Sequence, residues 1–333
     1  MIRTVLLLGL LAGLAACSDG QPFFPDENDG GDGDGDGNGG TGGNGTGASV
    51  SRSEEENDAG GGFVEDVRYD RGSDTFFVDN LAFDGDNVYR RDSDVPTLSD
   101  PGSRTRYRVF EGDEVVSDPA DGDTINQFEY RAIYGESRNR TADGEPATSF
   151  AIVRTGSYVD YGFGGFVYER NGGVDLPTAG QAVYAGDYAG LRTFSGTNGP
   201  GGMEYTTGEA RVAVDFRDFN EGRGVRGQIG DRRAFDMQGN RIATGTGEGQ
   251  LQLPDLVFDV GPGTVEANGE LSNGLRSYRN TPEGLQEYET GTYYAIMSGP
   301  NAREIVGVVV VESSDPRFDG VNVQETGGFI VYR

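Results

Sequence analysis

The sequence contains no histidine and no lysine, and a single cysteine, Cys17, occurs among its 333 residues. Histidine is the commonest metal ligand and the commonest general base, so its absence removes both. Ser–His and Cys–His nucleophile pairs cannot be formed either. From these absences we expect no metal site, no cofactor and no enzymatic activity. Carboxylate pairs are the catalytic groups that are left, and they keep a glycan hydrolase as a minority alternative.

Cations are scarce, and all of them are arginine. The 27 basic residues stand against 55 aspartates and glutamates, and the formal net charge is −28 at pH 7. A chain this acidic repels phosphate backbones and anionic lipid headgroups. We therefore expect no nucleic-acid partner and no direct binding to a membrane surface, whereas a basic protein or a cation is compatible with this charge.

The N-terminus has the pattern of an export signal. Arg3 precedes a short apolar run, Val5 to Leu11, which is too short to span a membrane and fits a signal peptide over residues 1–16. The run ends in Leu14-Ala15-Ala16-Cys17, the pattern of a lipoprotein-processing site. We expect Cys17 to carry the lipid that attaches the chain to the membrane, since an exported protein with an unpaired thiol otherwise needs a special explanation. Ser18 in place of aspartate favours delivery to the outer membrane. An ordinary signal peptide followed by an accidental cysteine is the alternative.

Residues 17–62 have the composition of a disordered tether. They are mostly Gly, Asp, Asn, Glu, Ser and Thr, with alternating Asp and Gly over 29–37. Such a segment cannot bury enough apolar surface to offset the entropy of ordering. Asp32, Asp34 and Asp36 imitate the start of a calcium loop, but Gly43 stands where the bidentate glutamate should be. We favour a plain linker over weak calcium binding.

From Phe63 onward, short runs rich in Val, Tyr, Phe, Thr and Ile alternate with Gly, Asp and Asn, which predicts an all-β body. One group of predicted strands lies in residues 63–175, a smaller β-rich domain: 63–69, 75–78, 88–90, 107–111, 127–134, 150–155 and 163–169. A second group lies in residues 176–333: 181–191, 209–216, 225–229, 251–258, 265–271, 290–297, 304–312 and 328–332.

Two of these strands show which faces are buried. Val212, Val214 and Phe216 alternate with polar neighbours, which predicts one buried and one wet face. Residues 305–311 are apolar on both faces, so we expect that strand to lie under a second layer. Glycines inside the strand that begins at Gln181 suit the bends of a small closed barrel.

The second group of strands resembles the β-barrel domain of the transferrin-binding protein B-like surface lipoproteins of Gram-negative bacteria. The residues that carry the resemblance are Gly180 to Gly190, Gly208-Glu209-Ala210, Val214-Asp215-Phe216, Gly227-Gln228-Ile229, Ser298 to Gly307, Gly327-Gly328-Phe329 and Arg333. The stretch Gly-Pro-Asn-Ala-Arg-Glu-Ile-Val-Gly is the most specific of them. The resemblance implies an eight-stranded antiparallel barrel over residues 176–333, with residues 63–175 as a handle-like domain before it.

The same resemblance implies a non-enzymatic binding lipoprotein of the outer membrane, exposed at the cell surface, that serves the acquisition of iron, haem or another solute. Its expected partner is an outer-membrane receptor, a host or environmental protein, or a small-molecule ligand. The family's binding residues lie in variable loops, so none is assigned here. The alternatives are a structural envelope lipoprotein without a specific ligand and, less favoured, the carboxylate-dependent glycan hydrolase.

Three further motifs have plain structural interpretations. Residues 222–227 match dinucleotide-binding spacing, but a strand follows where the motif needs a helix. Gly299-Pro300-Asn301 is a turn sequence between two predicted strands. The aromatic residues between Tyr158 and Tyr168 could stack on a flat ligand such as haem, but a hairpin with cross-strand aromatic pairs is favoured.

Replacement of the lipid acceptor tests the anchor. The Cys17→Ala variant should lose incorporation of a fatty-acid probe in metabolic labelling and should keep its signal peptide, because the thiol that accepts the lipid is gone. Labelling that is unaffected by the substitution would show that the chain is not a lipoprotein of this kind.

Overall fold

The computed structural model describes residues 47–54, 64, 66–79, 81, 88–91, 106–118, 120–156, 161–195, 202–219, 222–247, 249–262 and 264–333. All of them belong to one compact unit, residues 39–333. The predicted signal peptide, Cys17 and most of the predicted tether lie outside the described residues. Every regular element in the described part is a β-strand, so the predicted all-β class is confirmed. The described part accordingly has no helix long and apolar enough to cross a membrane.

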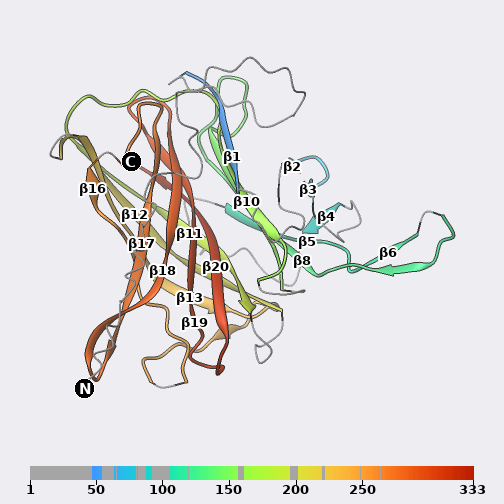
Figure 1. The fold of residues 1–333 in the computed structure, drawn as a ribbon. Coiled ribbons are helices and arrows are strands. Elements are labelled where there is room, and N and C mark those ends of the chain that lie inside the picture. Colours follow the sequence, from blue (N-terminus) through green and yellow to red (C-terminus); the bar gives the residue numbers. More distant parts are fainter. Residues whose placement is uncertain are drawn as a thin grey trace, which may run out of the picture. The chain divides into compact units, whose positions relative to one another are not determined.

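The first half of the body forms one antiparallel sheet (Figure 1). In spatial order its strands are β1 (Val50–Ser53), β10 (Gly164–Arg170), β9 (Thr148–Thr155), β8 (Tyr130–Glu136), β5 (Arg106–Glu111), β4 (Tyr89–Arg91), β3 (Thr75–Val78) and β2 (Val67–Asp70). A separate hairpin, β6 (Val115–Ser117) with β7 (Thr124–Asn126), lies between β5 and β8 in the chain. Aromatic side chains fill the core of this sheet: Phe76 stacks on Phe110, with ring centroids 5.3 Å apart.

The second half forms the predicted eight-stranded barrel. Its strands are β11 (Gln181–Ser195), β12 (Met203–Phe219), β13 (Gly222–Phe235), β15 (Leu256–Phe258), β17 (Glu270–Thr281), β18 (Gly284–Ser298), β19 (Glu304–Ser314) and β20 (Asn322–Tyr332). The short strands β14 (Arg241–Ile242) and β16 (Gly261–Pro262) pair with β13. The sheet runs β12-β11-β20-β19-β18-β17-β15-β13, and β12 also pairs with β13, which closes it.

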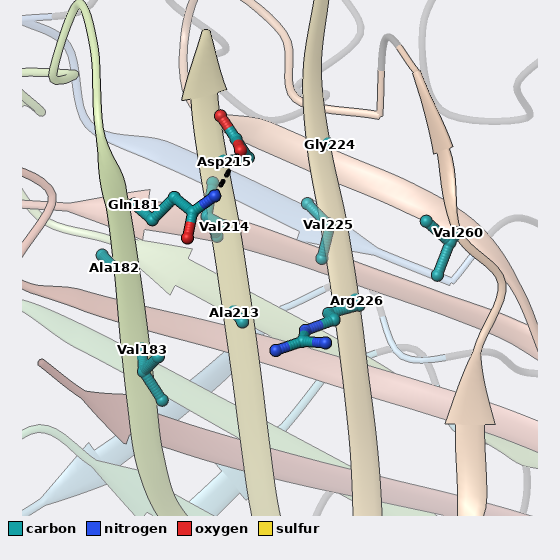
Figure 2. A pocket seen from close by; sticks show the side chains of 10 residues that line it. All are labelled: Gln181, Ala182, Val183, Ala213, Val214, Asp215, Gly224, Val225, Arg226 and Val260. Atoms are coloured by element: carbon teal, nitrogen blue, oxygen red, sulfur yellow. Dashed lines mark hydrogen bonds between the residues drawn. The ribbon is translucent and has the colours of Figure 1, made fainter. Parts of the chain in front are cut away.

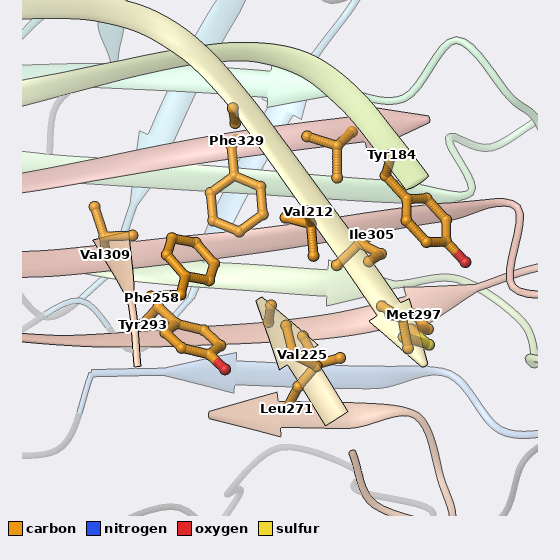
Figure 3. Close-up of a cluster of buried hydrophobic side chains, with 14 of the residues drawn as sticks. Tyr184, Val212, Val225, Phe258, Leu271, Tyr293, Met297, Ile305, Val309 and Phe329 are labelled. Carbon is orange, nitrogen blue, oxygen red and sulfur yellow. The ribbon is translucent and has the colours of Figure 1, made fainter. Parts of the chain in front are cut away.

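Alternate side chains of the barrel strands meet in an apolar core (Figure 3). Val212, Val214 and Phe216 all belong to it, which confirms the face predicted from their alternation. Aromatic rings fill its width, with Phe258 stacked on Tyr293 at a centroid distance of 4.2 Å. A side chain in place of Gly307 would meet the Phe329 ring and the wall of β18, so this position needs glycine for packing.

The first sheet packs on the outer wall of the barrel. Strands β9 and β10 lie against β18, β19 and β20. Val306 and Val308, on the outer face of β19, are completely buried, and Phe166 of β10 stacks on Tyr294 of β18 with centroids 5.8 Å apart. The prediction that the strand over 305–311 lies under a second layer is therefore confirmed.

The prediction of disorder through residue 62 is wrong for residues 47–54. Val50–Ser53 forms β1, which is antiparallel to β10, and Val50 is only 2% exposed. The strand is polar, so composition alone does not reveal it. Arg52 Nε lies 2.7 Å from a carboxylate oxygen of Glu270 on β17, and Glu54 lies 2.9 Å from the guanidinium of Arg154. Ion pairs and main-chain hydrogen bonds, rather than apolar burial, hold this segment in place.

The predicted strand over residues 265–271 is also wrong. Glu266 and Gly269 close a tight turn, with the Gly269 N–H donating to the Glu266 carbonyl, and β17 starts at Glu270. Strand β17 was not predicted because serine, asparagine and glycine, which have low strand propensity, separate its inward-facing leucines, Leu271 and Leu275.

Removal of the ion pair on β1 should destabilise the body. Arg52→Ala should lower the free energy of unfolding by roughly 3 kcal/mol, because the buried carboxylate of Glu270 loses its counter-ion. The matched control is Arg211→Ala, which breaks an exposed pair with Glu209 and should cost less than about 1 kcal/mol. Urea denaturation followed by circular dichroism measures both. Equal effects of the two substitutions would contradict the role assigned to β1.

Candidate functional site

The part of the barrel wall formed by β12 and β13 presents polar side chains to solvent. Glu209 and Arg211 on β12, and Arg226 and Gln228 on β13, are exposed. By contrast, Ala189 and Leu191 on the outer face of β11 are completely buried where the first sheet crosses that strand. The outer face of β11 is thus covered at the end near Leu191 and uncovered at the end near Val183, and the uncovered end borders the exposed wall.

A groove of about 370 Å³ lies on this exposed wall (Figure 2). Ala182, Val214 and Val225 point into the barrel core, so their strand neighbours point outward. The pairing brings the outward residues into two rows, one of Val183, Ala213 and Arg226, the other of Gln181, Asp215 and Gly224. Ala213 and Gly224 are small and sit in the middle strands, and a hollow results between their larger neighbours.

The flanks of the groove are apolar and exposed. Val183 on β11 is 66% exposed, and Val260, which follows β15, is 56% exposed. Val257 on β15 is exposed as well. Single apolar residues on a protein surface are ordinary. Here Val183 and Val260 line one cavity, so a bound apolar group would remove both from water together.

Two ionisable side chains line the groove, and they differ in their partners. Asp215 accepts hydrogen bonds from Gln181 Nε2 at 2.7 Å and from the Arg217 N–H at 3.1 Å. Arg226 has no carboxylate within ion-pair distance among the residues that the structure describes. Figure 2 shows its guanidinium extending from β13 toward Ala213 on β12. The groove therefore offers a cation with unused donors beside apolar surface.

No family model and no curated protein sequence matches the chain. Among solved structures, a double mutant of transferrin binding protein B from Haemophilus parasuis Hp5 is similar with a TM-score of 0.35 and 10% identity, over 78% of this chain and 41% of that chain. A mutant of transferrin binding protein B from Actinobacillus pleuropneumoniae H49 has a TM-score of 0.31 and 11% identity, over 69% and 99% of the two chains. A structure described as a surface lipoprotein has a TM-score of 0.30 and 11% identity, over 70% and 99%. The chain spans less than half the length of the first of these structures.

The residues singled out in the sequence lie elsewhere. Cys17 and Tyr158 are outside the described residues. Phe166 and Tyr168 are buried between the first sheet and the barrel, which agrees with the structural interpretation of the aromatic group rather than with a stacking platform. Burial raises the pKa of the Tyr168 phenol far above its ordinary value. Residues 222–227 lie in β13, and no helix follows them in the described chain, so the dinucleotide-binding interpretation is excluded as expected.

The turn sequence near residue 300 has the conformation that its composition predicts. Gly299, Asn301 and Ala302 all have positive φ, at 79°, 54° and 46°. The turn joins β18 to β19, and the Ala302 N–H donates to the Gly299 carbonyl at 3.1 Å. Glu304, which follows it, is buried and accepts hydrogen bonds from Ser137 Oγ at 2.7 Å and Thr148 Oγ1 at 3.1 Å on the first sheet. The motif thus forms a turn and joins the two sheets.

A second concentration of charge lies inside the barrel, beside its apolar core. Arg232 donates to both carboxylate oxygens of Glu289, at 2.8 and 2.9 Å, and to Glu325 at 2.7 Å. Burial acts to raise the pKa of Glu325, but the neighbouring arginines hold it below its ordinary value. The members of this network are Arg192, Arg232, Arg317, Glu204, Glu289, Asp315 and Glu325. Each of its carboxylates is paired with arginine, so the network is structural.

Metal ligands do not gather anywhere in the described ranges: no group of three or more Asp, Glu or Cys side chains there could hold a metal ion. The groove was not predicted from the sequence. Its signal is the pairing of Val183, Ala213 and Arg226, three residues far apart in the chain, which becomes visible only when the strand register is known.

Glu136 should give the first sheet a measurable acid sensitivity. Burial acts to raise its pKa, but hydrogen bonds from Arg71 and Arg140 and the charge of Arg108 lower it to about 2. A folded-state pKa below the unfolded value of about 4.3 stabilises the protein above that value, and the contribution is lost as the pH falls toward 2. Urea midpoints of Glu136→Gln should therefore lie below those of the unsubstituted chain at pH 7 and approach them near pH 2.5. A constant difference across this range would contradict the assignment, and the exposed Glu209→Gln serves as the control.

Proposed function

We propose that this chain is an outer-membrane lipoprotein, anchored through Cys17, whose all-β body acts as a non-enzymatic binding protein at the cell surface. The observation that carries the proposal is Leu14-Ala15-Ala16-Cys17, in which the only cysteine directly follows a signal-peptide pattern. A Gly- and Asp-rich tether before β1 would let the body work at a distance from the bilayer. The division into signal peptide (1–16), tether, first β domain and barrel (176–333) belongs to this proposal.

The chemistry of the described residues supports binding rather than catalysis. The chain has no histidine, and the seven charged residues inside the barrel pair with one another. A glycan hydrolase needs one carboxylic acid with a raised pKa and one free carboxylate on either side of a sugar-binding cleft. Asp215, the carboxylate that lines the groove, is held by hydrogen bonds to Gln181 and to the backbone of Arg217.

The kind of partner that we propose is based on the motif from Ser298 to Gly307. Surface lipoproteins that share it are binding proteins, so we propose that this body recognises an outer-membrane receptor, a host or environmental protein, or a small-molecule ligand. Acquisition of iron, haem or another solute is the process that such binding would serve. Transferrin binding is the property for which the two similar structures are named, and it is not assigned to this chain.

Haem is the less favoured solute. With no histidine and Cys17 acylated, tyrosine is the main candidate for an axial ligand. Two of the buried tyrosines already use their hydroxyls: Tyr184 donates to the Ala302 carbonyl at 2.6 Å and Tyr188 to Glu325 at 2.7 Å. Burial raises the pKa of Tyr184 to about 12, which disfavours the tyrosinate that iron requires. Any haem bound should show a tyrosinate-type spectrum or be held by its periphery alone.

Capture of a partner tests the binding role. Residues 18–333, immobilised by a tag, should retain a stoichiometric protein or small molecule from outer-membrane extracts or host serum. The control is Gly327→Leu, whose side chain would collide with the Tyr188 ring and disrupt the barrel. Capture of nothing stoichiometric would favour the structural envelope role instead. Release of reducing sugar from envelope glycans would favour the hydrolase.

A further inference from the structure

We infer that the groove over β11, β12 and β13 binds a small amphipathic monocarboxylate, an aliphatic chain that ends in one carboxylate. The inference rests on the proposed binding function and names a class of ligand for it. The groove itself stands on four observations: an unpaired arginine, two exposed valines, a floor of small residues and a carboxylate at one end.

Arg226 selects an anion. Several arginines on the barrel wall and at the seam between the sheets form close ion pairs; Arg52, Arg154 and Arg276 are examples, with distances of 2.5–2.9 Å to a carboxylate. Arg226 has no such partner within the described chain, although that chain is strongly acidic. A guanidinium binds a carboxylate through two parallel hydrogen bonds, and apolar surroundings strengthen them.

The apolar flanks select an aliphatic body. Val183 and Val260 stand on opposite sides of Ala213 and Gly224, and both valines are more than half exposed. An alkyl chain lying over the small floor residues would contact an exposed valine and remove it from water. An ion without an apolar part would leave them in water, so inorganic anions should bind only weakly.

Asp215 sets the charge and the direction of the ligand. It lies two residues from Ala213 on β12, which corresponds to roughly 7 Å along a strand, and Ala213 is the pairing partner of Arg226. Asp215 lines the same groove and repels anionic groups that come within the screening length, which is about 8 Å at physiological ionic strength. A second anionic group on the ligand would therefore be repelled. The carboxylate should lie at Arg226 and the alkyl chain should extend away from it.

The dimensions of the groove favour a small molecule over a macromolecule. Its volume of about 370 Å³ is at the lower end of the range for ligand pockets, roughly 300–1,000 Å³. A stable protein interface needs about 800 Å² on each partner. Outside the groove the same wall carries exposed Glu209, Arg211 and Gln228, so the apolar surface does not extend beyond Val183, Val257 and Val260 on this side.

Calorimetric titration of residues 18–333 with octanoate tests the inference. We expect saturable binding to one site per chain, and octanamide, which has the same shape without the charge, should bind at least about tenfold more weakly. Arg226→Glu should weaken octanoate binding at least about tenfold. Asp215→Asn should strengthen it about threefold, because a repelling charge is removed. Ala213→Leu should abolish binding by filling the floor.

Arg241→Glu is the matched control and should leave the affinity unchanged. Arg241 is an exposed arginine on β14, which pairs with the opposite end of β13, and it lies outside the groove. Arg226 and Arg241 are exposed and Asp215 is half-buried, and unchanged melting temperatures confirm that the charge variants fold. Equal octanoate affinity in Arg226→Glu and the unsubstituted chain would overturn the inference, as would the absence of saturable binding. If octanoate does not bind but extracts still yield a stoichiometric partner, the ligand class is wrong and the binding function stands. If octanoate binds as expected but Cys17 carries no lipid, the lipoprotein function fails and the groove stands.

Discussion

Closure of the barrel is the constraint on which the rest of the structure depends. Strand β12 hydrogen-bonds to β11 on one side and to β13 on the other, and this second pairing turns an open sheet into a closed wall. An eight-stranded barrel has an interior just wide enough for side chains. Side chains must therefore point inward and outward in turn along every strand, and the size of each inward side chain is limited. Gly307 beside Phe329 and Gly327 beside Tyr188 show that limit, since no Cβ fits at either position.

The closed interior also shows what arginine offers as a buried cation. Three arginines and four carboxylates lie inside the barrel next to the apolar core. Burial of a charge is tolerable only with excellent pairing, and the planar guanidinium offers a fork that matches a carboxylate. Arg232 uses this fork on Glu289. The excess carboxylate charge is relieved by neutral donors, since Tyr188 and Thr206 both donate to Glu325.

Sequence patterns predicted those parts of the fold that depend on local alternation and missed those that depend on pairing between distant strands. Val212, Val214 and Phe216 revealed their buried face because a strand repeats every two residues. β1 has no such repeat, and its order comes from β10 and from Glu270, more than a hundred residues away. The groove was invisible for the same reason: Val183, Ala213 and Arg226 become neighbours only through the register of three strands.

The outer face of strand β11 has one covered part and one exposed part. It is buried at Ala189 and Leu191, where the first sheet covers it, and exposed at Val183, where the groove begins. The predicted tether enters the body through β1, which is fixed to β10 and, through Arg52, to β17. Tension on a lipid anchor would therefore act on the seam between the two sheets, where Glu304 and Arg154 also join them. The groove residues Ala213 and Arg226 take no part in that seam, so a ligand bound there, as proposed, would not be subject to that tension.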